Sequence, residues 1–358
     1  MRDTTSDRGP VVIIELDGNG HRYSYVKAIA ERAVERGRGV HLIVGADWAD
    51  KPGADWIRAV LTLDGVALSH CDSLAGALTL AESVKASRVV LPDADRWLRS
   101  VALARAARRI PMSMLIMRPG CEGSYVSSAG ARFLVKRVLV RFYRVLGVRV
   151  FALVSALRVD PGRHELRDPV YLSPTSERFP DERIGTLDDD RFWFGLFGFI
   201  EPRKRPVDVL RSLRMSEPDG PIGIVVAGKV APTIAEPLAR EVEVCRQAGI
   251  DVRWLNDFLP DPALDYYIES VDALVVAYEN EGASGLLAKA AALGTSVAAA
   301  GSHSLRSDSQ TRPDLIRWSP LEDDGMRDMF RRMVSGGGRA VDPIPSPPRE
   351  FAARILGD

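Results

Sequence analysis

The feature that most constrains the fold is a repeated alternation of short apolar runs with longer amphipathic stretches. The first run is Val11-Val12-Ile13-Ile14-Glu15-Leu16, which is rich in β-branched residues and bounded by Pro10 and the turn Asp17-Gly18-Asn19-Gly20. An amphipathic stretch from Tyr23 to Arg36 follows. Because apolar runs of this length favour strands and a period near 3.6 favours helices, the chain opens with a strand, a glycine loop and a helix.

The same unit recurs along the first half of the chain. Predicted strands lie at 40–44, 88–91 and 112–117, and predicted helices at 75–86 and 97–109. Strands that alternate with helices favour a parallel sheet covered by helices on both faces. The first half is therefore predicted to be a doubly wound α/β domain.

A second series follows a polar, proline-containing stretch from Ser173 to Asp190, which is the best candidate for a linker. Predicted strands lie at 192–199, 222–227, 252–255 and 273–277, and predicted helices at 207–213, 234–248, 262–269 and 284–293, with a short helix at 349–356. The expected divisions are 1–175, 176–335 and a tail at 336–358. Two Rossmann-like domains would face each other across a cleft that holds the ligand at the carboxyl ends of the strands.

Composition excludes several classes of protein. The 358 residues are 46% hydrophobic and 27% charged, with 48 basic and 48 acidic side chains, as in ordinary globular proteins. Cys71, Cys121 and Cys245 are far apart and lack any CxxC spacing, which argues against a disulfide framework or a structural zinc site. The polar N-terminus lacks the apolar core of a secretory signal, and no segment approaches the roughly 20 apolar residues of a membrane span. We expect a cytoplasmic protein.

The first strand and the first helix are joined by a glycine loop, Gly18-Asn19-Gly20-His21-Arg22. Its small residues would let a ligand approach the backbone N–H groups at the start of the helix. It is not a dinucleotide fingerprint, because Tyr23 stands where GxGxxG requires glycine. His21 is a candidate catalytic residue that could carry a proton. The alternatives are a tight turn without a ligand and a structural histidine.

A basic loop follows the predicted strand at 192–199 and reads Phe197-Gly198-Phe199-Ile200-Glu201-Pro202-Arg203-Lys204-Arg205-Pro206. Pro206 suits the first turn of a helix, so three cations would crowd the positive end of its dipole. A phosphate or diphosphate held by Lys204 and Arg203 would relieve that repulsion. The alternative is a basic turn exposed to solvent.

A third loop precedes the alanine-rich helix and reads Glu279-Asn280-Glu281-Gly282-Ala283-Ser284-Gly285-Leu286-Leu287. Ser284 can cap the helix, and the two glycines leave its first N–H groups open to a phosphate. Glu281 would accept hydrogen bonds from sugar hydroxyls. The alternative is a capped helix with no ligand.

A basic amphipathic helix is predicted in the first half, where Arg132, Lys136, Arg137, Arg141 and Arg144 recur at helical spacing. Glu122 is the only acidic residue from Ala102 to Leu157. Such a helix could lie on an anionic membrane or receive an anionic acceptor. Alternatively, it docks on its own domain with a solvated cationic face. No nucleic-acid-binding module accompanies the charge, so nucleic acid is not an expected partner.

Four motifs together resemble those of the retaining glycosyltransferases with the two-domain GT-B fold, family 4 (glycosyl transferases group 1). They are Gly198 to Lys204; Ala227-Gly228-Lys229; Phe258-Leu259-Pro260-Asp261 through Asp272-Ala273; and Glu281-Gly282-Ala283-Ser284-Gly285 with Gly294-Thr295-Ser296-Val297. The resemblance covers most of the chain.

The resemblance implies a hexosyltransferase that uses a nucleotide-diphosphate sugar, with no metal or cofactor. The C-terminal domain would bind this donor, and Lys204 and Arg203 would neutralise the departing diphosphate while Glu281 holds the sugar. The implied donor-binding set is Gly198, Gly228, Gly282, Ala283, Ser284, Gly285, Leu286 and Lys289. The N-terminal domain, with Gly18, Asn19, Gly20 and Arg22, would hold a hydroxyl acceptor such as a glycan, a lipid or a small natural product. The C-terminal helix would pack back on that domain.

One position departs from the family pattern. The family commonly has a second Glu eight positions after the first, in contact with the nucleotide ribose, whereas this chain has Lys289. The departure motivates an alternative hypothesis, a catalytically degenerate GT-B protein that binds a ligand or a partner. A sugar-nucleotide epimerase on the same scaffold is a third hypothesis.

Overall fold

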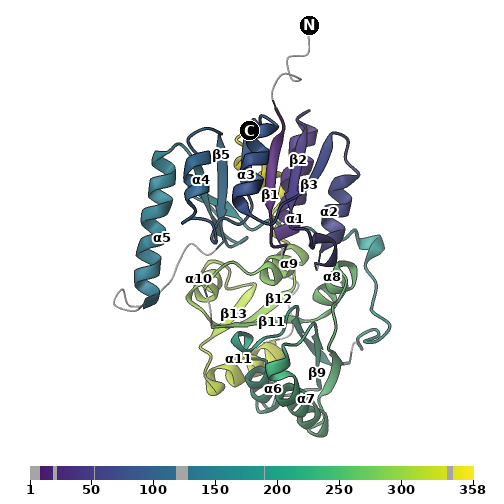
Figure 1. Cartoon of the computed structure of the whole chain (residues 1–358). Coiled ribbons are helices and arrows are strands. Elements are labelled where there is room, and N and C mark those ends of the chain that lie inside the picture. The colour runs from purple at the N-terminus through teal and green to yellow at the C-terminus, as the bar shows by residue number, and fades with distance from the viewer. Residues whose placement is uncertain are drawn as a thin grey trace. The chain divides into compact units, whose positions relative to one another are not determined.

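The computed structural model describes residues 9–18, 22–51, 53–117, 128–188, 190–279, 281–336 and 342–358, without the side chains of 128–133 (Figure 1). The chain divides into two compact units. The first comprises Met1–Val154, Asp160–Pro169 and Pro347–Asp358, and the second comprises Ser155–Val159 and Val170–Ser346.

The first unit is built on a seven-stranded parallel sheet in the order β3-β2-β1-β4-β5-β6-β7. The strands are β1 (Val11–Glu15), β2 (Val40–Val44), β3 (Val66–His70), β4 (Arg88–Leu91), β5 (Met112–Ile116), β6 (Arg149–Val154) and β7 (Glu165–Arg167). The helices are α1 (Arg22–Glu35), α2 (Ala54–Leu61), α3 (Leu74–Ser83), α4 (Val101–Ala106), α5 (Ser128–Val145) and α12 (Pro348–Leu356). All five residues of β1 are buried, as expected for a central strand covered on both faces.

The second unit has a six-stranded parallel sheet in the order β10-β9-β8-β11-β12-β13. The strands are β8 (Phe192–Phe197), β9 (Ile222–Ala227), β10 (Asp251–Leu255), β11 (Ala273–Tyr278), β12 (Ser296–Gly301) and β13 (Ile316–Ser319). The helices are α6 (Pro206–Arg214), α7 (Pro232–Gln247), α8 (Asp261–Ser270), α9 (Gly285–Leu293), α10 (His303–Thr311) and α11 (Asp323–Gly336).

In each sheet the strand order reverses beside the first strand of the unit. The reversal lies between β1 and β4 in the first sheet and between β8 and β11 in the second. Loops diverge at such a switch point, which is where open α/β sheets bind ligands. The glycine loop follows β1, the basic loop follows β8, and the Glu281 loop follows β11. The three sequence-predicted loops therefore begin at the switch points.

The prediction of two doubly wound α/β units is confirmed, with one helix boundary corrected. The helix predicted at 97–109 is α4, which begins only at Val101 because Ser100 caps it, its Oγ accepting from Leu103 N at 3.4 Å.

Helix α12 belongs to the first unit, where it packs against α1. The ring of Phe351 lies 5.4 Å from that of Tyr25, and Arg32 forms an ion pair with Asp358 at 3.1 Å. The Tyr25 hydroxyl donates to the buried Asp168 at 2.8 Å. These contacts tie the end of the chain to the first unit.

Candidate functional site

The switch point of the second unit brings the basic loop and the Glu281 loop together. The N–H of Glu279 donates to the carbonyl of Arg203 at 3.1 Å. The Lys204 ammonium lies 5.9 Å from the centre of the Tyr278 ring, and the Tyr278 hydroxyl lies 3.0 Å from Ser284 Oγ. Tyr278, which the sequence analysis did not single out, therefore connects the two predicted loops.

The three cations of the basic loop have different partners. Arg203 pairs with Glu201, and Arg205 pairs with Asp208 at 2.6 Å and Glu279 at 3.1 Å. The expected crowding of three uncompensated charges is thus wrong for both arginines. Lys204 is 7% exposed, donates to the carbonyl of Phe197 at 3.4 Å, and forms no ion pair within the described part of the chain.

Burial and, to a smaller extent, the positive charge of Arg203 together lower the pKa of Lys204 to about 8, while Glu201 opposes the shift. A buried cation without a carboxylate partner is an unfavourable arrangement. A bound anion would stabilise the charged form, so Lys204 is the side chain of this loop best suited to hold a phosphate.

Two glycines, one after β8 and one after β9, allow the backbones of the two loops to lie in close contact. Gly198 and Gly228 have φ of +81° and +149°, and a Cβ at Gly228 would lie 1.9 Å from the carbonyl oxygen of Gly198. A Cβ at Gly198 would lie 3.6 Å from Lys204 Nζ and 3.5 Å from Leu286 Cδ1. The structure therefore brings together Gly198, Lys204, Gly228 and Leu286 of the predicted set.

We expect Gly228→Ala to destabilise the protein by about 3 kcal/mol or more, because both the positive φ and the collision must be relieved. The matched control is Gly249→Ala, where φ is +85° but no atom lies within 4 Å of the added Cβ. This control is expected to lose only about 1–2 kcal/mol. Urea denaturation measures both changes, and equal losses would contradict the close packing described for Gly228.

Helix α9 presents a free N-terminus at the same place. Ser284 Oγ accepts from Leu287 N at 3.3 Å, which confirms the predicted cap. No acceptor among the described residues receives the N–H groups of Gly285 and Leu286. These donors can bind an anion.

Glu281 anchors its loop to the next helix. Its Oε1 and Oε2 accept from the N–H groups of His303 and Ser304, each at 2.8 Å, at the start of α10. Gly282, with φ of +140°, follows and donates its N–H to Ser304 Oγ at 3.4 Å. Because each carboxylate oxygen can accept a second hydrogen bond, the contact with a sugar stays a prediction.

Lys289 lies in a buried ion pair. Its Nζ donates to Asp265 at 2.5 Å and to the carbonyl of Tyr171 at 3.2 Å, and lies 3.5 Å from Asp261. Asp265 has no exposed surface, and its second oxygen accepts from Ser173 N at 2.7 Å. The structure thus gives Lys289 a structural role, holding residues 171–173 against α8 and α9, that sequence spacing did not indicate.

In the first unit, only part of the glycine loop can be placed. Asn19, Gly20 and His21 lie outside the described residues. The Arg22 guanidinium donates to Asp17 at 2.5 Å and pairs with Asp93 at 2.6 Å. Gly18 has φ of +60°, and a Cβ there would collide with the Tyr23 ring.

The predicted basic helix is α5. Its buried Tyr143 donates to the carbonyl of Leu98 at 3.1 Å, and Lys136 pairs with Asp95 at 2.7 Å. Arg137 and Arg141 are exposed, and Arg144 donates to the carbonyl of Val150. The side chain of Arg132 is outside the part of the chain that the structure describes. The exposed large apolar residues of this helix are Leu134, Val135, Val138, Phe142 and Val145. The helix is docked on its own unit but keeps a mixed basic and apolar surface.

Within the described ranges no three His, Cys, Asp or Glu side chains are grouped to hold a metal, and the expectation of metal-free chemistry stays a prediction. Among the described helices, none has the length and apolar character that crossing a bilayer requires.

Solved structures of low sequence identity match nearly the whole chain. They include Anabaena HepE with UDP and glucose (TM-score 0.61, 12% identity, 98% and 97% of the two chains) and sucrose-phosphate synthase from Thermosynechococcus elongatus (0.62, 12%, 98% and 94%). The chain has the GT-B fold. AviGT4, a glycosyltransferase involved in avilamycin A biosynthesis, is a third match (0.57, 13%, 98% and 96%). No protein-family model matches the sequence, and the comparison with curated proteins gives no match. At these identities the similarity shows the GT-B fold alone.

Proposed function

We propose that the protein is a retaining glycosyltransferase of the family 4 type, which moves a hexose from a nucleotide-diphosphate sugar to a hydroxyl acceptor. The observation that carries the proposal is Lys204, a buried cation without an ion-pair partner in the described structure, beside the free N-terminus of α9. Support also comes from the solved structure of HepE, which contains UDP and glucose on the same fold.

The proposed roles of these residues depend on where negative charge develops during sugar transfer. As the bond between sugar and diphosphate breaks, negative charge grows on the leaving phosphate. Lys204 and the N–H groups of Gly285 and Leu286 would stabilise that charge without reorganising. Arg203 would contribute from its half-exposed position, and Glu281 would hold the sugar. The acceptor would give its proton to the leaving phosphate, on the same face as the departing bond.

The test is turnover with candidate nucleotide sugars. Release of the nucleoside diphosphate, even by slow hydrolysis, would establish that the protein acts on the donor. The anomeric configuration of a transfer product, read by NMR, would then decide the stereochemistry, and retention is the expected result. A product of inverted configuration would contradict the family 4 assignment.

The second candidate function is a degenerate GT-B scaffold that binds a ligand or a partner without turnover. The observation that favours it is Lys289, which is engaged with Asp265 and leaves no carboxylate at that position for a ribose. This protein would bind a nucleoside diphosphate in calorimetry but would neither hydrolyse nor transfer any sugar. Turnover of any donor would exclude it.

We further propose that the exposed face of α5 contacts anionic membranes, because Val138 and Val145, 62% and 81% exposed, lie beside Arg137 and Arg141. Val138→Asp is expected to reduce binding to phosphatidylglycerol vesicles about tenfold, measured by co-sedimentation. Val101→Asp, at an equally exposed valine of α4, should leave binding unchanged. Equal binding to phosphatidylcholine vesicles, or no effect of Val138→Asp, would contradict the proposal.

A further inference from the structure

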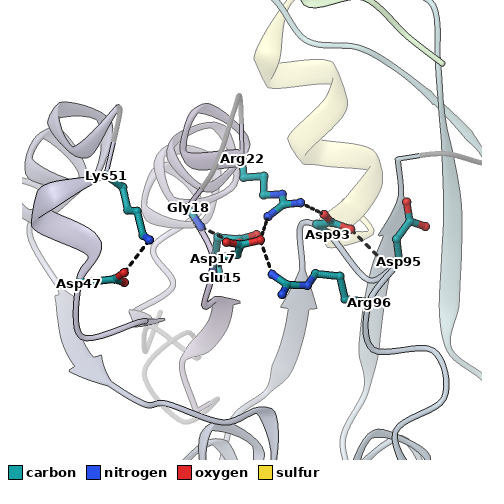
Figure 2. Close-up of polar contacts among 9 residues, drawn as sticks. All are labelled: Glu15, Asp17, Gly18, Arg22, Asp47, Lys51, Asp93, Asp95 and Arg96. Atoms are coloured by element: carbon teal, nitrogen blue, oxygen red, sulfur yellow. Dashed lines mark hydrogen bonds and ion pairs between the residues drawn. The ribbon is translucent and has the colours of Figure 1, made fainter. Parts of the chain in front are cut away.

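A second group of charged side chains lies at the switch point of the first unit, where β1 and β4 end (Figure 2). We name it the Glu15 cluster: Glu15, Asp17, Arg22, Asp93 and Arg96. Glu15 is the last residue of β1, Arg22 begins α1, and Asp93 follows β4. The cluster does not include the undescribed residues of the loop.

Ion pairs fix most of the cluster. Figure 2 shows Arg22 between Asp17 and Asp93. Its Nη1 lies 2.5 Å from Asp17 Oδ2, and its Nη2 lies 2.6 Å from Asp93 Oδ2. Arg96 also pairs with Asp17. The other oxygen of Asp93 accepts from Asp95 N at 3.0 Å. Opposite charges are therefore held side by side in a fixed arrangement.

Glu15 is the incompletely satisfied member. Its side chain is 4% exposed, and Oε1 accepts from the N–H groups of Asp17 and Gly18 at 3.0 and 3.3 Å. Oε2 receives no hydrogen bond from any residue that the structure describes. A carboxylate oxygen without a donor can accept a hydrogen bond from a ligand.

The surroundings of Glu15 also set its protonation. Burial raises the pKa of Glu15 to about 7, with Asp93 acting in the same direction, while Arg22 and the N–H groups of Asp17 and Gly18 oppose the shift. Tyr23 faces it from α1, and its own pKa is raised to about 12 by burial and by Glu15. Tyr23 is thus neutral and Arg22 charged between pH 6 and 8, whereas Glu15 titrates in that range.

We propose that the Glu15 cluster binds a neutral polyhydroxylated ligand, such as a sugar or a cyclitol, through Glu15 Oε2 and the adjoining carboxylates and guanidiniums. The inference rests on the proposed function, within which this ligand is the acceptor. It names the acceptor class, which the sequence left open between glycan, lipid and small natural product.

The mixed charges of the Glu15 cluster favour a neutral ligand over an ion. Asp17 and Asp93 would repel an anion at the positions where they hold Arg22, while Arg22 and Arg96 would repel a cation. Each hydroxyl of a polyol is both a donor and an acceptor, so it can pair with either sign. A polyol also supplies the donor that Oε2 lacks.

The experiment titrates the full chain with three six-carbon probes, neutral myo-inositol, the amine glucosamine and the anion glucose 6-phosphate, by saturation-transfer NMR at pH 6 to 8. Inositol is expected to bind best. Its affinity should rise about fivefold from pH 6 to pH 8, because a carboxylate accepts a hydroxyl hydrogen bond more strongly than a neutral carboxyl does. Stronger binding of the amine or the phosphate, or an inositol affinity that is flat with pH, would overturn the proposal.

Variants provide the second arm. Glu15→Gln should fold, but it should weaken inositol binding at pH 8 and remove the pH dependence of that binding. The control is Glu82→Gln, on the exposed surface of α3 in the same unit, which should change neither the inositol affinity nor its pH dependence. The pH profile of the unmodified protein stands even if Glu15→Gln fails to fold.

UDP affinity is measured in parallel to separate the two proposals. UDP binding without inositol binding overturns the acceptor site and leaves the proposed function intact. Inositol binding without binding of any nucleoside diphosphate supports the site and contradicts the proposed function. If neither inositol nor any nucleoside diphosphate binds, both the acceptor site and the proposed function are contradicted.

Discussion

Replacing Lys204 with alanine is expected to weaken nucleoside diphosphate binding by about 2 to 4 kcal/mol, which is a loss of roughly 30- to 1,000-fold in affinity. The large effect follows from burial, because a desolvated ammonium interacts with a phosphate more strongly than an exposed one does. Isothermal titration calorimetry measures it directly.

The matched control for this prediction is Arg240→Ala, which removes an exposed cation of the same unit. This variant should leave the affinity for the nucleoside diphosphate unchanged. A second readout is pH: since Lys204 has a pKa of about 8, it loses its proton between pH 7 and 9, and wild-type affinity should fall over that range. The alanine variant should lack this fall. If Lys204→Ala bound the diphosphate as tightly as the wild type, the donor site would lie elsewhere.

Lys289→Glu is expected to destabilise the second unit by about 3 to 5 kcal/mol, because it replaces the cation of a buried pair by a like charge. The new carboxylate would face Asp265, which has no exposed surface, and Asp261. Urea denaturation monitored by tryptophan fluorescence measures the loss, with circular dichroism to verify folding at zero urea.

A double variant tests the cause of that loss. Lys289→Met should also destabilise, since Asp265 is left buried without its cation, but adding Asp265→Asn should recover most of the stability because Asn can still accept from Ser173 N. If Lys289→Glu were as stable as the wild type and bound nucleotide more tightly, position 289 would face the ribose after all.

The fold was predictable because buried parallel strands produce continuous apolar runs. Strands β1 and β9 are buried throughout and were predicted from such runs. Strand β3 was not predicted. It lies at the sheet edge, no residue of it is fully buried, and its sequence Val66-Ala67-Leu68-Ser69-His70 carries a weak apolar signal. Burial alone does not decide the outcome, because the edge strand β10 was predicted whereas β12, buried except at Gly301, was not. The sequence of β12, Ser296-Val297-Ala298-Ala299-Ala300-Gly301, has only one β-branched residue.

The candidate site was predictable only where its determinants are local. The Ser284 cap and the position of Pro206 at the start of α6 depend on a few neighbouring residues, and both are confirmed. The charge partners are not local. Arg205 meets Glu279, and Lys289 meets Asp265 and the carbonyl of Tyr171, across many residues of sequence. Only folding determines which cation is compensated, and so which one is left for a ligand.

The same limit applies to Glu15 and Asp93 in the first unit. A single carboxyl at the end of the run Val11 to Ile14 is visible in the sequence, but its burial and its neighbour from β4 are not. A charged residue at the end of an apolar strand that precedes a glycine loop is the signal that would have found it.

The most direct test of the central claim is a calorimetric titration of the purified protein with UDP, GDP, ADP, dTDP and CDP and with their sugar conjugates. We expect one nucleotide to bind selectively, at one site per chain, and Lys204→Ala to weaken this binding by roughly 30- to 1,000-fold. No binding across the whole panel would contradict the assignment of a nucleotide-sugar donor site.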